Sequence, residues 1–245
     1  MRNICLLASL LLFLACTEEE VPSQPVVYDG DLEIRSLSDL KDIAERGYTT
    51  INGVLAIHYT NEVEDFSLLK NLQEVSGLII RYNDDLQSLK GLENIEKVAF
   101  LEIESNLELK DLTGLENLKS VTKILSIKDN DQLGSLAGLK ALTSLKEQFV
   151  LFDNRSLTNL HGLEQLQEAQ QMLITNNVNL TSLEGLENLN TSADIRVYSN
   201  DSLIDFCALS NFMEKKGEED SYVALLNAFN PTIADFENGN CVWIP

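Results

Sequence analysis

The chain repeats one arrangement of apolar and polar positions every 23 or 24 residues. Each copy holds one polar residue, here called the anchor, at a fixed place among apolar residues. Apolar residues stand five and three positions before every anchor, and three, six, nine and twelve positions after it. The anchors are Thr60, Asn83, Asn106, Asn130, Asn154, Asn177 and Asn200. Self-similarity at a fixed period is typical of repeat proteins, in which each copy forms one structural unit.

The two halves of the repeat predict different local structures. Before the anchor, inward and outward positions alternate, and a period of two is typical of a strand with one buried face. After the anchor, the spacing of three residues is too tight and too short for an amphipathic helix, so it indicates turns. One unit cannot bury its apolar side alone. Successive units must therefore stack, with their strands paired in a parallel sheet about 4.8 Å apart.

The anchors and a set of glycines have structural roles in this stack. An Asn amide bonds backbone groups in the turn that leaves the strand, and stacked copies are predicted to form a ladder inside the coils. Thr60 does this only in part. Glycine stands eight positions after five of the anchors, where a left-handed backbone or close packing of coils is the simplest explanation. These glycines are Gly91, Gly114, Gly138, Gly162 and Gly185.

Length and charge limit the possible functions. The chain has 245 residues, of which 44% are hydrophobic, and this is enough for one sizeable domain. Its formal net charge is -21. Nucleic acid or an anionic lipid surface would be repelled over most of such a surface, so neither is an expected partner.

The N-terminus resembles a bacterial lipoprotein signal. A positive start and the apolar run "ICLLASLLLFLA" precede Cys16, and "FLAC" resembles a lipobox in which that Cys carries the lipid, although Phe13 replaces the usual Leu or Val. The following "TEEE", Thr17, Glu18, Glu19 and Glu20, resembles the surface-export signal of Bacteroidetes-type lipoproteins. The alternatives are an ordinary signal peptide and a solvated acidic linker.

These features divide the chain into three predicted parts. Residues 1–15 are a lipoprotein signal peptide, residues 16–28 an acidic, proline-containing tether, and residues 29–245 the repeat domain. The prediction places the protein at the outer membrane, attached only through its lipid and displayed on the cell surface. Cys207 and Cys241 remain as an even pair in an oxidising compartment, where a disulfide would join them.

The pattern "LxIxxNxxLxxLxGLxxL" resembles the receptor L-domain family from about Asp29 to Cys241. This resemblance implies a mainly β fold: a single right-handed β-helix, or leucine-rich solenoid, of about seven coils with capping segments. It also implies a short N-terminal helix near Ser38 to Arg46. The internalin-like leucine-rich repeat is a close competitor, but its unit of about 22 residues places Leu two rather than three positions after Asn.

The family resemblance also implies a role. L-domains bind ligands on a rigid surface, but the cysteine-rich modules, transmembrane helix and kinase of the animal receptors are missing from this sequence, so receptor signalling is not inferred. The segments "DFCALSNFM" and "NAFNPTIADFENGNC" look like the bacterial C-terminal cap of the family. That likeness supports a bond between Cys207 and Cys241.

Candidate chemistry is sparse. Motifs for a hydrolytic nucleophile, a phosphate-binding loop, a CxxC pair and an HExxH metal site are absent from the sequence, and no catalytic residue, metal or cofactor is expected. His58 and His161 are predicted to be surface residues. Glu102 and Glu104 lie on one face with Arg81 and Lys128, where charge pairing across strands is expected. Five turn aspartates fit either a calcium site or a soluble acidic rim: Asp84, Asp129, Asp131, Asp153 and Asp201.

The outward positions of the strands give the candidate ligand face. One predicted exposed cluster mixes apolar, aromatic and Arg side chains, a composition enriched at interfaces: Val150, Phe152, Leu173, Arg196 and Tyr198. A second cluster joins His58, Tyr59, Arg81 and Tyr82. The competing interpretation is a sheet that tolerates exposed β-forming residues.

The sequence therefore predicts a non-enzymatic surface lipoprotein that binds a protein or glycan ligand. Two alternatives stay open. One is a periplasmic structural or accessory subunit, and the other is a glycan-cleaving β-helix enzyme that uses Glu102 or Glu104.

Overall fold

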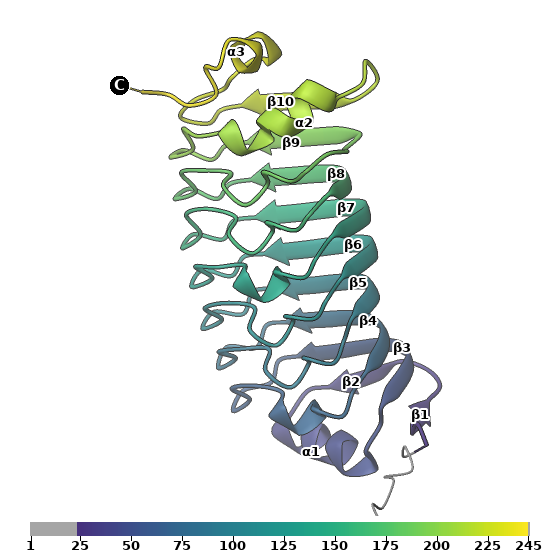
Figure 1. The fold of residues 1–245 in the computed structure, drawn as a ribbon. Helices are drawn as coiled ribbons and strands as arrows, with labels where there is room; N and C mark the ends of the chain where they lie inside the picture. Colours follow the sequence, from purple (N-terminus) through teal and green to yellow (C-terminus); the bar gives the residue numbers. More distant parts are fainter. Residues whose placement is uncertain (1–23, 245) are drawn as a thin grey trace, which may run out of the picture.

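The computed structural model describes residues 24–244, which form one ten-stranded sheet and a few short helices (Figure 1). Every pairing between strands of the sheet is parallel, and from β3 to β10 each strand lies beside the next one in the sequence. The strands are β1 (Val27–Tyr28), β2 (Leu32–Ile34), β3 (Thr50–His58), β4 (Glu74–Arg81), β5 (Lys97–Glu104), β6 (Ser120–Lys128), β7 (Ser144–Phe152), β8 (Glu168–Thr175), β9 (Asp194–Tyr198) and β10 (Ser221–Leu225). The helices are α1 (Leu37–Arg46), α2 (Ser210–Lys215) and α3 (Ile233–Glu237), with the 3-10 turns η1 (Ser67–Leu69), η2 (Ala137–Leu139) and η3 (Cys207–Leu209).

The predicted repeat unit is confirmed as one strand followed by turns. Equivalent residues of successive units pair in the sheet, so Leu55 lies opposite Leu78 and Leu78 opposite Leu101. The alternating inward residues and the leucines of the turns meet in one continuous hydrophobic core. Most of these side chains are inaccessible to solvent, and Phe66, Phe149 and other large residues fill the interior. The structure is thus mainly β, as predicted.

The predicted N-terminal helix is present and starts one residue earlier than expected. α1 begins after Ser36, whose hydroxyl accepts a hydrogen bond from the Asp39 backbone N–H at 3.1 Å, and it ends at Gly47 with a φ of 65°. Both features are standard helix boundaries, because the N-cap side chain satisfies a free N–H and glycine adopts the left-handed conformation at low cost. Its residues Leu40 and Ile43 are buried against the core.

The sheet extends beyond the predicted strands at both ends. β1 pairs with β3 although Val27 and Tyr28 fall within the segment predicted as a tether. β2 supplies a further coil in which Leu32 lies opposite Leu55. At the other end β10 pairs with β9, with Val223 opposite Arg196.

The Asn side chains form the predicted ladder inside the coils. Each amide oxygen accepts from the preceding anchor, and each amide nitrogen donates to a backbone oxygen of the preceding coil. For Asn106, the side chain donates to the Ile80 carbonyl at 3.1 Å and to the Asn130 oxygen at 3.2 Å. The ladder begins at Thr60, which donates to Asn83 at 2.7 Å, and continues to Asn227, which accepts from Asn200 at 3.0 Å. All these side chains are buried, so the ladder satisfies polar groups that the apolar core could not.

The repeated glycines are required by close packing. At Gly114, a Cβ atom would lie 2.0 Å from the Leu89 carbonyl oxygen of the preceding coil, and φ is 112°. Gly91, Gly162 and Gly185 have the same positive φ. Gly138 does not, but its Cβ would lie 1.8 Å from the Leu112 carbonyl oxygen. Both predicted reasons therefore operate, and the close approach is shared by all five positions.

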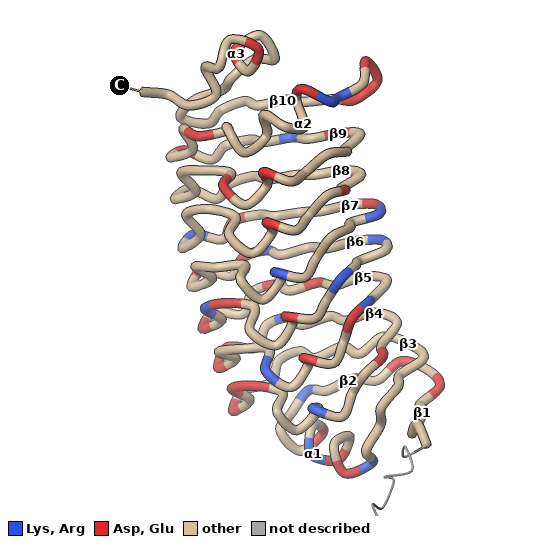
Figure 2. The backbone as a smooth tube through the Cα atoms, viewed as in Figure 1, with Lys and Arg blue, Asp and Glu red and all other residues tan. Residues whose placement is uncertain are grey.

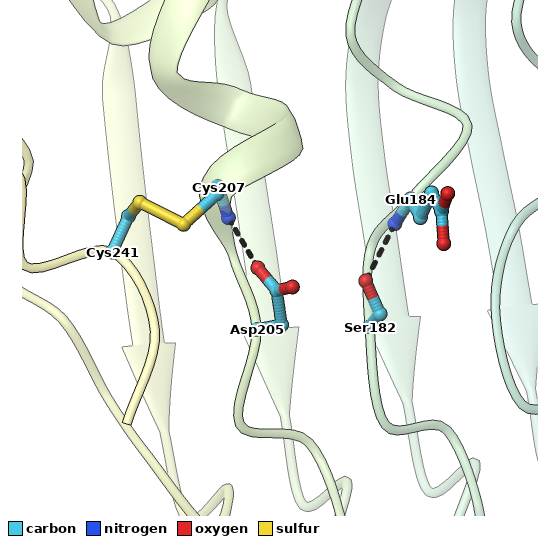
Figure 3. The surroundings of a disulfide bond; sticks show 5 residues. All are labelled: Ser182, Glu184, Asp205, Cys207 and Cys241. Atoms are coloured by element: carbon cyan, nitrogen blue, oxygen red, sulfur yellow. Dashed lines mark hydrogen bonds between the residues drawn. A yellow bond between two sulfur atoms is a disulfide. The ribbon is translucent and has the colours of Figure 1, made fainter. Parts of the chain in front are cut away.

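A disulfide joins Cys207 to Cys241 and ties the C-terminal segment to the last coil (Figure 3). Cys207 begins η3, where its backbone N–H donates to the Asp205 carboxylate at 2.9 Å. The Phe206 N–H donates to the Cys241 carbonyl at 2.9 Å, so the backbones lie side by side at the bond. In the part of the chain that the structure describes, no helix has the length and apolar character needed to span a membrane.

Candidate ligand-binding surface

The outward face of the sheet carries three columns of side chains that run from coil to coil. They stand two, four and six positions before the anchors, because alternate residues of a strand point to the same side. Most of these side chains are half-buried, since each is flanked by its counterparts on the neighbouring strands. The face is therefore a continuous surface rather than a set of isolated side chains.

The structure brings the five residues of the first predicted cluster together on β7, β8 and β9. Val150 lies opposite Leu173, which lies opposite Arg196, while Thr175 stands between Phe152 and Tyr198 in the next column. Only Arg196 is exposed; the other four are half-buried. The predicted exposed cluster is thus a partly shielded apolar surface with one projecting guanidinium.

A hollow of about 530 Å³ opens on this surface. It includes three residues of the predicted cluster, whereas Val150 and Phe152 lie outside it. The hollow is lined by Gln148, Gln171, Met172, Leu173, Thr175, Asp194, Arg196 and Tyr198. Gln148, Gln171 and Asp194 belong to the column six positions before the anchor, which the sequence analysis did not include. One further step of the same alternation would have found them.

The charged pair in the hollow leaves one acceptor free. The Nε of Arg196 lies 2.8 Å from Oδ2 of Asp194, and this carboxylate raises the pKa of the guanidinium. The other carboxylate oxygen, Oδ1, is buried and has no hydrogen-bond partner among the described residues. A buried acceptor without a donor costs roughly 1–3 kcal/mol. Because Oδ1 is not exposed, a ligand hydroxyl or amide recovers that cost only if the Asp194 side chain turns toward the hollow.

A second and larger hollow, of about 670 Å³, lies where β3, β4 and β5 begin. Its lining includes Asn52, Gln73, Glu74 and Lys97, and it contains neither an aromatic residue nor Arg. Aromatic and Arg side chains supply most of the binding energy at protein surfaces, so size alone does not favour this hollow. The β7–β9 hollow has both residue types and an unpaired acceptor, and we take it as the candidate site.

The second predicted cluster forms a stack of rings. The His58 and Tyr59 rings are 5.3 Å apart, and the Tyr59 and Tyr82 rings are 5.1 Å apart and nearly parallel. Tyr59 is 59% exposed and Tyr82 39%. The nearby carboxylate of Glu104 raises the pKa of the Tyr82 hydroxyl. Neighbouring rings thus cover one another in part, and both tyrosines remain exposed.

Both tyrosines also occupy a strained backbone position that recurs in every coil. The residue just before the anchor has a positive φ in eight successive turns, with 56° at Tyr59 and at Tyr82. Non-glycine residues seldom adopt this conformation, although Asn and Asp tolerate it better than tyrosine. The other members of the column are Ser105, Asp129, Asp153, Asn176, Ser199 and Leu226.

The acidic pair of the enzyme hypothesis is engaged by a single arginine. Arg81 forms an ion pair with Glu102 and lies 3.2 Å from Glu104. Lys128 lies opposite Glu104 in the adjacent strand. The predicted charge pairing across strands is confirmed for Arg81, which leaves its guanidinium committed within the protein. Neither glutamate lines the β7–β9 hollow.

The remaining candidate residues are the two histidines and the turn aspartates. His161 is exposed and lies 3.2 Å from Glu164. His58 faces outward from β3 and contacts Glu33 at 2.5 Å. Burial, and then the charge of Asp153, raises the pKa of Asp129. Among residues 24–244, no group of three or more His, Cys, Asp or Glu side chains is arranged to hold a metal ion.

The predicted lipidation and export residues, Cys16 and Thr17 to Glu20, lie outside the described residues. A comparison of the sequence with protein-family models and with curated proteins found no match. The functional argument therefore depends on the residues and on their geometry.

Proposed function

We propose that this chain is a non-enzymatic, lipid-anchored protein of the outer membrane that recognises a protein or glycan ligand. The ligand binds the outward face of β7–β9 around Leu173, Arg196 and Tyr198. The observation that carries the proposal is the hollow on that face, where an apolar floor meets the Arg196 guanidinium and its Asp194 partner. Few polar groups placed over an apolar surface are typical of recognition sites.

The finer description of the fold is part of the same proposal. We assign the domain to the receptor L-domain type, a right-handed β-helix with caps at both ends. The 23-to-24-residue repeat, the parallel register and the buried Asn ladder support this assignment. A framework in which each strand from β3 to β9 is held by neighbours on both sides is rigid, and a preformed surface loses little entropy on binding.

The proposed location follows from the first twenty residues. Cys16 would carry the lipid, and Thr17 to Glu20 would direct export to the cell surface. The Cys207–Cys241 bond supports a location outside the cytoplasm, because structural disulfides persist in oxidising compartments. The net charge of -21 would keep the body of the protein away from an anionic lipid surface while the tether holds it nearby.

Binding to immobilised host glycans and host surface proteins tests the proposal. Leu173→Gln removes the apolar floor of the hollow and Arg196→Ala removes its guanidinium, and each is expected to weaken binding at least about tenfold. The matched control is Ile79→Gln, because Ile79 occupies the same half-buried column of the sheet on β4. Equal binding by Leu173→Gln, Arg196→Ala and the unaltered protein would contradict the assignment of the site.

A further inference from the structure

β10 is the last strand of the sheet, and it has a strand neighbour on one side only. Its backbone bonds identify which residues face that neighbour. The Ser221 N–H donates to the Ala193 carbonyl at 2.8 Å, and the Leu225 carbonyl accepts from the Ser199 N–H at 3.1 Å. Since backbone groups alternate in direction along a strand, Tyr222 and Ala224 direct their N–H and C=O groups to the opposite side.

A hollow of about 530 Å³ lies along this free edge. It is bounded by β10 and by the segment that leads into α3, and the lining carries no charge. The lining residues are Tyr222, Val223, Ala224, Leu225, Asn230, Pro231, Thr232, Ile233 and Ala234. Leu225 is 54% exposed and Ile233 42%. The edge therefore combines free backbone groups with accessible apolar side chains.

β10 carries no charged residue, although α3 partly covers it, with the Phe236 ring 5.7 Å from the Tyr222 ring. Exposed edge strands commonly carry charged residues, which oppose pairing with another chain. β2, at the other end of the sheet, has Glu33 at its centre, followed by Arg35. By contrast, residues 221–234 contain no Lys, Arg, Asp or Glu, in a chain of which 23% is charged. Figure 2 shows the same contrast between the uncharged β10 and the charged loop before it.

Acidic residues flank the uncharged edge on both sides. Glu218, Glu219 and Asp220 precede β10, and Asp235 and Glu237 follow the lined segment in α3. A strand lying along β10 would place its ends near these carboxylates. Basic residues at the ends of that strand would therefore be attracted, and acidic residues would be repelled.

We infer that β10 is a docking edge for an extended segment of a partner protein, which adds a strand to the sheet. The segment has an uncharged, β-forming centre of about five residues and Lys or Arg at its ends. An extended polypeptide is the chemistry that meets the observations, because it supplies backbone donors and acceptors to Tyr222 and Ala224 together. The inference concerns a surface separate from the β7–β9 hollow and does not depend on the ligand of that hollow.

A synthetic peptide, acetylated KKTVTVTKK amide, is the probe. Titration calorimetry with the folded protein should give a Kd on the order of 0.1 mM, weakening as salt is added. Hydrogen exchange should slow at the backbone amides of Tyr222 and Ala224 when the peptide is present. The peptide EETVTVTEE, with the same centre and acidic ends, should bind at least about tenfold more weakly.

Two variants locate the binding. Ala224→Pro removes an N–H that faces the free edge, and the bonds to β9 remain, so the peptide affinity should fall at least about tenfold. If that variant does not fold, Val223→Lys places a charge on the edge and should have the same effect. The inference is overturned if the peptide fails to bind at about 1 mM. It is also overturned if binding is unchanged in the folded variants, or if the exchange of Tyr222 and Ala224 is unaltered.

Discussion

The anchor asparagines show how a single side chain joins three coils. Asn130 accepts from the backbone and the side chain of Asn106 at 3.1 and 3.2 Å. It also donates to the Ile103 carbonyl at 3.1 Å and to the Asn154 oxygen at 3.3 Å. A shorter or apolar side chain could not reach all four groups. This requirement explains why every anchor after Thr60, from Asn83 to Asn227, is Asn.

Replacing Asn130 by Ala should therefore destabilise the protein by about 3–5 kcal/mol, because several buried donors and acceptors lose their partners together. Equilibrium denaturation with urea measures the change. Asn94→Ala is the control, since Asn94 is exposed and makes one hydrogen bond, to the Lys70 carbonyl at 2.8 Å. Its cost should stay below about 1 kcal/mol. Similar costs for the two variants would show that the ladder is not a stabilising element.

The glycine requirement can be tested with a matched pair of substitutions. Gly114→Ala should cost about 3 kcal/mol or more, because φ is 112° and the new Cβ would meet the Leu89 carbonyl oxygen at 2.0 Å. At Gly134 the nearest atom to a new Cβ is 3.9 Å away, so Gly134→Ala should change the stability by less than about 1 kcal/mol. Urea denaturation measures the free energy of unfolding of both variants. A loss below about 1 kcal/mol for Gly114→Ala would contradict the close packing of coils.

Residue-level features without a hydrophobic signal could not be predicted. The column of positive φ values carries Tyr, Ser, Asp, Asn and Leu, and no single residue type identifies it in the sequence. Its strain belongs to the turn that ends each strand, because Tyr59 before Thr60 has the same φ as Tyr82 before Asn83. Oδ1 of Asp194 likewise has no partner because Arg196 contacts the other oxygen, Oδ2. This contact depends on how the side chains of the face pack together.

At the scale of elements, alternation before an anchor was sufficient to predict β3 to β9. It failed at β10 because Asn227 follows Asn200 by 27 residues rather than 23 or 24, and the leucine columns do not continue after it. β2 was not predicted, because its anchor position is occupied by Leu37, the first residue of α1. Both misses occur where a coil gives way to a cap, since the cap replaces the repeat before the sheet ends.

The disulfide belongs to the C-terminal cap and should stabilise it. Replacing Cys207 and Cys241 by Ser should lower the free energy of unfolding by roughly 3–4 kcal/mol, because the unfolded chain loses a cross-link that closes a long loop. Coils of a repeat contact only their neighbours, so faster hydrogen exchange should be confined to η3, α2, β10 and α3. Denaturation with and without reductant provides the same comparison in the unaltered protein. An unchanged stability would show that the cap is held by its packing alone.

At the scale of the whole molecule, the architecture leaves one broad face of side chains open to solvent. The sequence predicted two clusters on this face. In the structure, Leu173, Arg196 and Tyr198 line a hollow. Arg81, from the other cluster, instead contacts Glu102 and Glu104. The alternation identifies outward residues, whereas the shape of the surface depends on side-chain sizes in three adjacent strands. For that reason the face could be predicted and the hollow could not.

We propose that this face is displayed outside the cell. Protease treatment of intact cells tests it directly, with the native protein compared with a variant carrying Ala at Glu18, Glu19 and Glu20, and with a periplasmic protein as the control for cell integrity. We expect the native protein to be cleaved while the variant and the control stay intact. Protection of both forms would contradict surface display and would favour a periplasmic accessory subunit.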